Sequence, residues 1–223
     1  MADFTAMFEA GINGNTITTA PGEASLTAWD EIFILTTLTY DNDPVAHGAL
    51  SARLEGSGTR MTWNLPTPTD HYGRVYLYVT STALDFTFVI VDNPAFTGVV
   101  SISCVSGKIR VSDSVAATTD GTVNIATNQW VRIEYHVIHS ATVGQIEAKL
   151  FNNAESSTPS DTITSPANRN TSTQAFDVRF LISGIAGPIN MDSIVANAIS
   201  YPGPAVAPSI VNFAPVIYGR GAC

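Results

Sequence analysis

The chain has 223 residues, a formal net charge of −9 and a sequence pI of about 4.7. Charged residues make up 13% of it, against a usual share of about 25%. Lys108 and Lys149 are the only lysines and no basic stripe exists, so the sequence argues against nucleic acid or an anionic membrane as a partner.

The N-terminus and the cysteines narrow the class further. Residues 1–4 lack the basic and apolar regions of a signal peptide, and no window is long and apolar enough to span a bilayer. We therefore expect a chain that is made in a cytoplasm and is not secreted by a cleaved signal. Cys104 lies in an apolar run and is expected in the core, while Cys223 is the last residue. Two cysteines so placed make neither a disulfide framework nor a zinc site.

Short segments of alternating polar and apolar residues predict β-strands along the whole chain. Turn signals separate them, among which Ser106-Gly107 and Asp120-Gly121 are of the hairpin type. A polar stretch over residues 152–173 is predicted to be a long loop that carries one short strand. In chain order, the predicted strands are a short one before a turn at 11–15, then residues 16–19, 29–35, 49–55, 59–65, 72–80, 86–91, 99–105, 108–112, 122–126, 130–139, 145–151, 161–164, 176–183 and 191–201.

The hairpin over residues 130–151 is the clearest of these predictions. Each arm alternates with period two, and a short loop that ends in a glycine joins the arms. A slip of one residue would exchange the two faces of a strand, so the register must set apolar residues against apolar ones. This register places Glu134 opposite Lys149 and His136 opposite Glu147. Each such pair contributes roughly 0.2–1 kcal/mol.

The fold class follows from the number and spacing of the strands. No segment has helical periodicity, and many short strands with turns about every 8–12 residues indicate a sandwich or barrel. We predict an all-β fold, with a single antiparallel β-sandwich over residues 1–204 and an extended arm over residues 205–223. The arm is apolar and nearly uncharged, and Pro208 and Pro215 lack the N–H group that a central strand needs.

Several runs along the chain carry a family resemblance. They are residues 8–9, 11–14, 48–53, 76–79, 107–111, 129–135, 144–150, 191–195 and 203–204. In this order they resemble the concanavalin A-like, or laminin-G-like, jelly-roll domains found in virion proteins of tailed bacteriophages that infect actinobacteria. The resemblance covers about residues 4–204. It implies two curved antiparallel sheets of about a dozen strands and a role in the tail or on the capsid surface, often with glycan binding.

One strand presents a candidate binding face. Tyr72, Arg74, Tyr76 and Tyr78 share one side of the strand predicted at 72–80. Tyr and Arg are typical of binding surfaces, and tyrosine rings can stack on sugars. The alternative is that the tyrosine rings complete the packing under a loop or a neighbouring strand.

Catalysis has little support in the sequence. Glu134 and Glu147 share a face, but the glucanase pattern of carboxylates in one strand is absent, and we expect the two to be held by cross-strand partners. We therefore predict that the chain is not an enzyme and has no catalytic residues.

Metal binding has little support either. The acid-amide turns at residues 41–43 and 92–93 offer too few oxygens for calcium, and the four histidines have no metal spacing. We predict no metal site and no cofactor.

The resulting hypothesis is a structural bacteriophage virion protein, either a minor tail or tail-tip protein or a capsid decoration protein. Its partners would be other virion subunits, and it would be oligomeric. The alternative is a lectin-like module that binds host-surface glycan, and a glycan-degrading enzyme ranks last. The arm is expected to lie on a neighbouring subunit or, alternatively, to fold back on its own sandwich. Its candidate contact residues are Val206, Ile210, Phe213, Val216, Ile217 and Tyr218.

Overall fold

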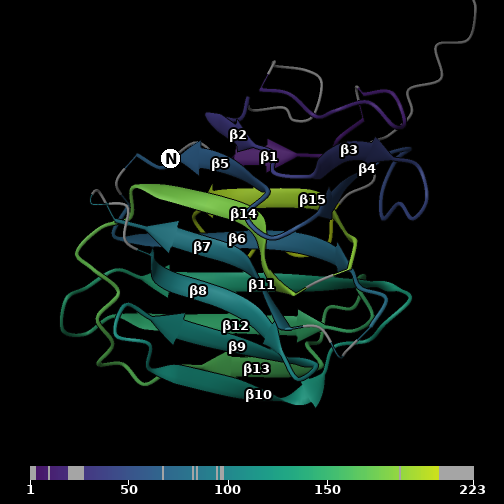
Figure 1. Cartoon of the computed structure of the whole chain (residues 1–223). Helices are drawn as coiled ribbons and strands as arrows, with labels where there is room; N and C mark the ends of the chain where they lie inside the picture. Colours follow the sequence, from purple (N-terminus) through teal and green to yellow (C-terminus); the bar gives the residue numbers. More distant parts are fainter. Residues whose placement is uncertain are drawn as a thin grey trace, which may run out of the picture.

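The computed structural model describes residues 4–9, 11–19, 28–66, 68–81, 83, 85–93, 95, 98–185 and 187–205. Within this part, fifteen strands form two antiparallel sheets that pack face to face, and there is no helix (Figure 1). The described residues therefore provide no helix that could span a bilayer. The predicted antiparallel β-sandwich is confirmed.

Sheet A has the strand order β13-β12-β11-β6-β15-β4-β3, and β1 pairs with β15. Its strands are β1 (Phe4–Ala6), β3 (Thr37–Asp41), β4 (Ser51–Glu55), β6 (Asp70–Tyr78), β11 (Trp130–Ile138), β12 (Gln145–Phe151), β13 (Asp161–Thr164) and β15 (Ile189–Ala198). Sheet B has the order β10-β9-β8-β7-β14-β5-β2. Its strands are β2 (Glu31–Phe33), β5 (Arg60–Asn64), β7 (Asp85–Asp92), β8 (Gly98–Val105), β9 (Lys108–Asp113), β10 (Thr118–Asn124) and β14 (Asp177–Ile185).

The hydrophobic core lies between the inner faces of the two sheets. Trp29 and Trp63 stack at a ring distance of 3.8 Å, and Phe180 meets both rings edge-on. The indole N–H of Trp63 donates to the carbonyl of Ala28 at 3.0 Å, so this large side chain is buried without losing its hydrogen bond. Cys104 is fully buried in the core, as predicted.

The hairpin of β11 and β12 has the predicted register, with Glu134 opposite Lys149 and His136 opposite Glu147. On the other side, β11 pairs with β6 and sets Glu134 opposite Arg74. The polar residues of three adjacent strands therefore share the outer face of sheet A.

One predicted turn is wrong. Asp120-Gly121 lies inside β10, where the pairing with β9 becomes irregular after Asp120. The carboxylate of Asp161, at the start of β13, accepts the backbone N–H groups of Thr122 at 2.6 Å and Val123 at 2.9 Å. This contact joins the edge strand of sheet B to the edge strand of sheet A, which exposes fewer unpaired groups at that edge.

Other boundaries also differ from the predictions. Residues 16–19 form no strand, and only Thr16 makes a single bridge to Thr39. The expected strand at 29–35 is reduced to β2, and β15 ends at Ala198 rather than residue 201.

The acid-amide turns predicted at residues 41–43 and 92–93 each begin at the last residue of a strand. Asp41 is the last residue of β3, and Asp92 is the last residue of β7. Asp92 is buried and forms an ion pair with Arg179 of the adjacent strand β14.

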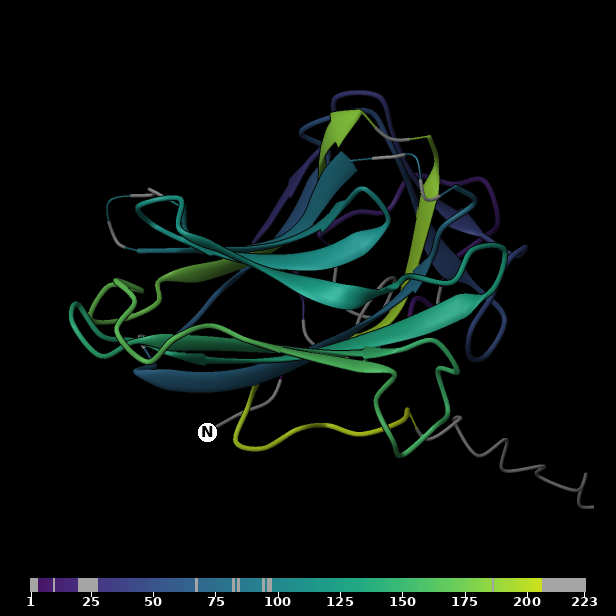
Figure 2. The ribbon, with the colours of Figure 1, turned by 90° about the horizontal axis from the view of Figure 1, so that it is seen from below.

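The chain after β15 runs along the outside of sheet A. We call residues 199–205 the strap; it is drawn in yellow beneath the sheet in Figure 2. Ala205, the first residue of the predicted arm, is still buried against the sandwich. The remaining arm residues lie outside the described part of the chain, and with them the six predicted contact residues from Val206 to Tyr218.

Candidate functional site

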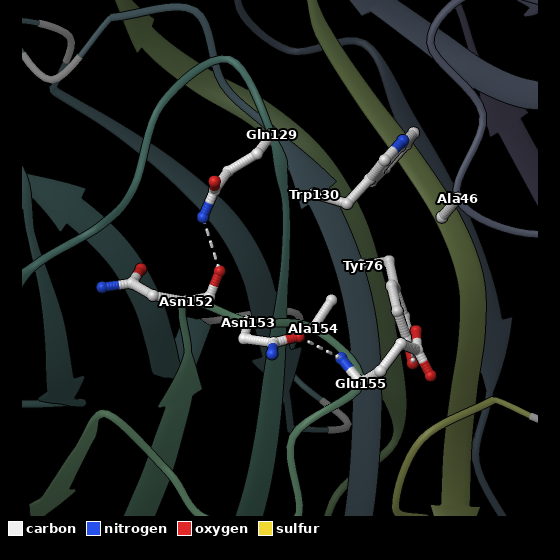
Figure 3. Close-up of a pocket in the computed structure, with 8 residues that line it drawn as sticks. All are labelled: Ala46, Tyr76, Gln129, Trp130, Asn152, Asn153, Ala154 and Glu155. Atoms are coloured by element: carbon white, nitrogen blue, oxygen red, sulfur yellow. Dashed lines mark hydrogen bonds between the residues drawn. The ribbon is translucent and has the colours of Figure 1, made fainter.

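A pocket of about 480 Å³ opens at one end of the outer face of sheet A. Its residues come from four places: the loop before β4, strand β6, the start of β11 and the loop after β12. Figure 3 shows the lining side chains, in which the amide of Gln129 points to the carbonyl of Asn152 and Oδ1 of Asn153 accepts the backbone N–H of Glu155 at 3.3 Å. The residues that line it are Ala46, Tyr76, Gln129, Trp130, Asn152, Asn153, Ala154 and Glu155.

The loop after β12 is fixed mainly by the side chain of Asn152. Its Oδ1 accepts the N–H of Ala126 at 2.7 Å, and its Nδ2 donates to the carbonyl of Asn124 at 2.9 Å. Its backbone carbonyl accepts the amide of Gln129 at 2.7 Å (Figure 3). Because one asparagine ties together three chain segments, this wall of the pocket is built before any ligand arrives.

A buried arginine supports the same loop from below. Arg132 donates from Nη1 to the carbonyl of Ala154 and from Nη2 to the carbonyl of Ser156 at 2.7 Å. Its guanidinium lies 3.8 Å from the ring centre of Phe151 and forms an ion pair with Glu134 at 2.9 Å. The side chain of Arg132 is 1% exposed, so the loop is built over a charge that water does not reach.

Tyr76 forms the floor of the pocket and is fully buried. Its hydroxyl donates to Oε1 of Glu155 at 3.2 Å, and the same carboxylate oxygen contacts Nε2 of His47 at 3.1 Å. Burial raises the pKa of Tyr76, which keeps this hydroxyl a donor. Glu155 is 56% exposed, so it is anchored at one oxygen while the carboxylate faces solvent.

Asp192 positions the loop that carries Ala46. Its Oδ2 accepts the backbone N–H groups of Ala46 at 3.1 Å and His47 at 3.0 Å, and its Oδ1 accepts that of Ser193 at 2.6 Å. Burial raises the pKa of this carboxyl to about 7, although the three N–H groups favour the charged form. Asp192 pairs with Tyr76 across the strands, and so it sets the pocket wall next to the pocket floor.

Trp130 forms the aromatic wall. It is half-buried at the start of β11, and its ring meets Tyr78 edge-on at 5.6 Å. Its indole N–H has no hydrogen-bond partner among the described residues. The nitrogen itself is buried, so Trp130 presents to the pocket the carbon atoms of its half-buried ring.

The structure places all four predicted binding residues on the outer face of sheet A, but only Tyr76 lines the pocket. Tyr78 stands behind Trp130. Arg74 is buried, and it donates to the carbonyls of Ser193 at 3.0 Å and Gly203 at 2.8 Å. It therefore holds the strap in place.

Tyr72 lies at the other end of this face. Its ring stacks on His136 at 3.9 Å, and Tyr201 of the strap meets it edge-on at 4.9 Å. Tyr72 thus packs against the strap, as in the alternative interpretation of the tyrosine rings on this face.

The two carboxylates weighed for catalysis lie away from the pocket and are held by protein groups. Glu134 is 4% exposed, and burial raises its pKa against the influence of Arg132. Glu147 contacts Lys149 at 3.4 Å and accepts hydrogen bonds from Tyr201 and Thr164. Lys149 thus forms its ion pair with Glu147 rather than with Glu134, its partner in register.

Metal ligands do not cluster in the described part of the chain. It contains no group of three or more His, Cys, Asp or Glu side chains that could hold a metal ion.

Comparisons with known proteins define the fold. No protein-family model and no curated protein matches the sequence. A solved sialidase chain is similar with a TM-score of 0.52 and 6% identity, over 76% of this chain and 17% of that one. The binding domain of botulinum neurotoxin serotype D is similar with a TM-score of 0.53 and 7% identity, over 87% and 47%.

This chain spans less than half of the length of either solved chain. At such identities the likeness extends to the fold alone. The all-β jelly-roll sandwich implied by the resemblance is confirmed.

Proposed function

We propose that this protein is a carbohydrate-binding module whose site is the pocket between Trp130, Gln129, Asn153 and Glu155. The observation that carries the proposal is the half-buried indole of Trp130 beside two amides and a partly exposed carboxylate. A sugar ring has an apolar face of C–H groups that packs on an aromatic ring, and hydroxyls that need donors and acceptors around its rim.

The pocket offers both kinds of contact. The amide of Asn153 and the second N–H of the Gln129 amide can donate to sugar oxygens, and the carboxylate of Glu155 can accept from hydroxyl groups. The supporting hydrogen bonds of Asn152 and Arg132 hold these groups without a ligand, so less entropy is lost on binding. The jelly-roll fold adds support, because one similar solved chain is a binding domain.

Binding to a glycan array, followed by calorimetry on the best oligosaccharide, tests the proposal. Replacing Trp130→Ala should weaken binding at least about tenfold, since stacking on the ring is lost. The matched control is Phe33→Ala, which truncates a 39% exposed aromatic side chain on sheet B. If no glycan binds, or if Trp130→Ala binds as well as the unchanged protein, the proposal is wrong.

A structural role in a phage virion, with a virion localisation and other virion subunits as partners, stays a prediction from the sequence resemblance. It is compatible with glycan binding, because a virion surface protein can carry both roles. Electron microscopy of the native particle, with this chain located in the map, tests it directly. We also propose that the module is not catalytic, because Glu134 and Glu147 are held by neighbouring side chains outside the pocket.

A further inference from the structure

The charges around the pocket are unevenly distributed. Of the described residues that line it, Glu155 alone is charged, and its side chain is 56% exposed. Trp130, Gln129 and Asn153 complete the rim with neutral groups. A ligand in the pocket therefore meets one negative charge and several uncharged polar groups.

The cations that touch lining residues are already used. Arg132 is 1% exposed, donates to the carbonyls of Ala154 and Ser156, and forms an ion pair with Glu134. Arg74 lies 5.6 Å from the ring centre of Tyr76, but it donates to main-chain carbonyls under the strap.

His47 is similarly engaged. One ring nitrogen contacts Ser193 at 3.0 Å, the other contacts Glu155 at 3.1 Å, and its side chain is 8% exposed. None of these three side chains can turn into the pocket without leaving a buried partner unpaired.

From this arrangement we infer that the pocket selects uncharged sugars and rejects sialylated or uronic-acid glycans. The inference rests on the proposed function and names the substrate class of the same site. Among the described residues no uncommitted cation lies at the pocket, so a ligand carboxylate would enter beside Glu155 unneutralised by them, within a chain whose net charge is −9. A neutral pyranose instead donates its hydroxyls to Glu155 and places its apolar face on Trp130.

The test compares neutral oligosaccharides with their sialylated or uronic-acid counterparts on one array, at about 0.05 M and 0.5 M salt. Neutral members should bind, and acidic counterparts should bind at least about tenfold more weakly at low salt. The difference should narrow at high salt, because the screening length falls from above 10 Å to a few ångströms.

Two charge variants separate a local from a global effect. Glu155→Gln should narrow the discrimination at low salt, measured as the ratio of neutral to acidic binding within the same variant. Glu31→Gln removes the same charge from the far sheet, where Glu31 pairs with Arg60, and it should change nothing. If Glu155→Gln does not fold, the salt dependence of the unchanged protein is the test: discrimination that does not narrow at about 0.5 M salt would overturn the inference.

The outcomes distinguish the two proposals. Acidic glycans that bind as tightly as neutral ones, with both lost in Trp130→Ala, would overturn the selectivity and leave the proposed function standing. An equal ratio of neutral to acidic glycan binding in Glu155→Gln and in the unchanged protein would also overturn the role given to Glu155. Absence of binding to every glycan would overturn the proposed function and this inference with it.

Discussion

The hydroxyl of Tyr76 accepts a hydrogen bond from the backbone N–H of Ala205 at 2.9 Å. The same hydroxyl donates to Glu155 on the pocket rim. One phenol therefore connects the floor of the pocket to the end of the strap, and both partners depend on it.

Removing this hydroxyl should loosen the strap. In Tyr76→Phe the buried N–H of Ala205 loses its acceptor, which should cost about 1–3 kcal/mol of unfolding free energy. Hydrogen exchange at residues 199–205 should become faster, measured by mass spectrometry. Tyr78→Phe is the control, because its hydroxyl makes no hydrogen bond among the described residues. Unchanged exchange in Tyr76→Phe would contradict the link.

The buried ion pair of Arg132 and Glu134 should dominate the energetics of the outer face. Breaking it with Arg132→Met leaves a buried carboxylate without its cation, and we expect a loss of about 3–5 kcal/mol. A double-mutant cycle of Glu134→Gln with Lys149→Met should give a coupling of only about 0.2–0.5 kcal/mol, since Lys149 contacts Glu147 and the ring of Tyr201. Urea unfolding measures both free energies. A coupling between Glu134 and Lys149 that exceeds the loss in Arg132→Met would reverse this ranking.

The same pair shows what strand periodicity can and cannot predict. Arg132 and Glu134 occupy polar positions of β11, so the alternation predicts that they face solvent. The structure buries both, because the strap and the loop after β12 form an additional layer over the sheet. Periodicity reports which face a residue shares and carries no information about what a distant segment lays upon that face.

Part of the site could nevertheless be predicted from the sequence. The confirmed register sets Arg132 opposite Phe151, so the residues just before β11 must lie beside those just after β12. Gln129 and Asn152 are therefore neighbours by register alone. The contributions of Ala46 and Glu155 depend on Asp192 and Tyr76, which come from distant strands, and no local pattern links them.

Two buried histidines should make the fold sensitive to acid. His71 contacts His139 at 3.1 Å with their rings stacked, and burial lowers the pKa of both. The unfolded chain holds these protons with a pKa of about 6.5, so it binds more protons than the folded chain below that pH. Stability from this pair is complete above about pH 6.5 and is lost as the pH falls below it.

The variant His71→Phe should therefore show a smaller fall in melting temperature between pH 7 and pH 5 than the unchanged protein. Tyr135→Phe serves as the control, because this ring meets His71 edge-on and carries no group that titrates in that range. Equal pH slopes in His71→Phe and the unchanged protein would show that the pair does not carry the acid sensitivity.

Asp192 should change the stability with pH in the opposite direction to the two histidines. Its pKa is raised to about 7, so the folded chain holds this proton more tightly than the unfolded chain. The stability linked to this group is complete below the unfolded value of about 4 and is lost as the pH rises through 7. Asp192→Asn should therefore gain stability relative to the unchanged protein between pH 5 and pH 8 in urea unfolding. A relative loss over that interval would mean that the three N–H groups outweigh burial.

The boundary between sandwich and arm can be tested with two truncations. Removing residues 206–223 keeps the hydrogen bond of Ala205 to Tyr76, and the melting temperature should change by no more than a few degrees. Removing residues 200–223 also takes away Gly203 and Tyr201, which leaves Arg74 without one acceptor and Glu147 without a donor. Because Arg74 is buried, this second truncation should lower the melting temperature by about 5 °C or more. A large fall with the shorter truncation alone would place residues beyond Ala205 in the sandwich, and the predicted role of the arm in contacting a neighbouring subunit would lose its basis.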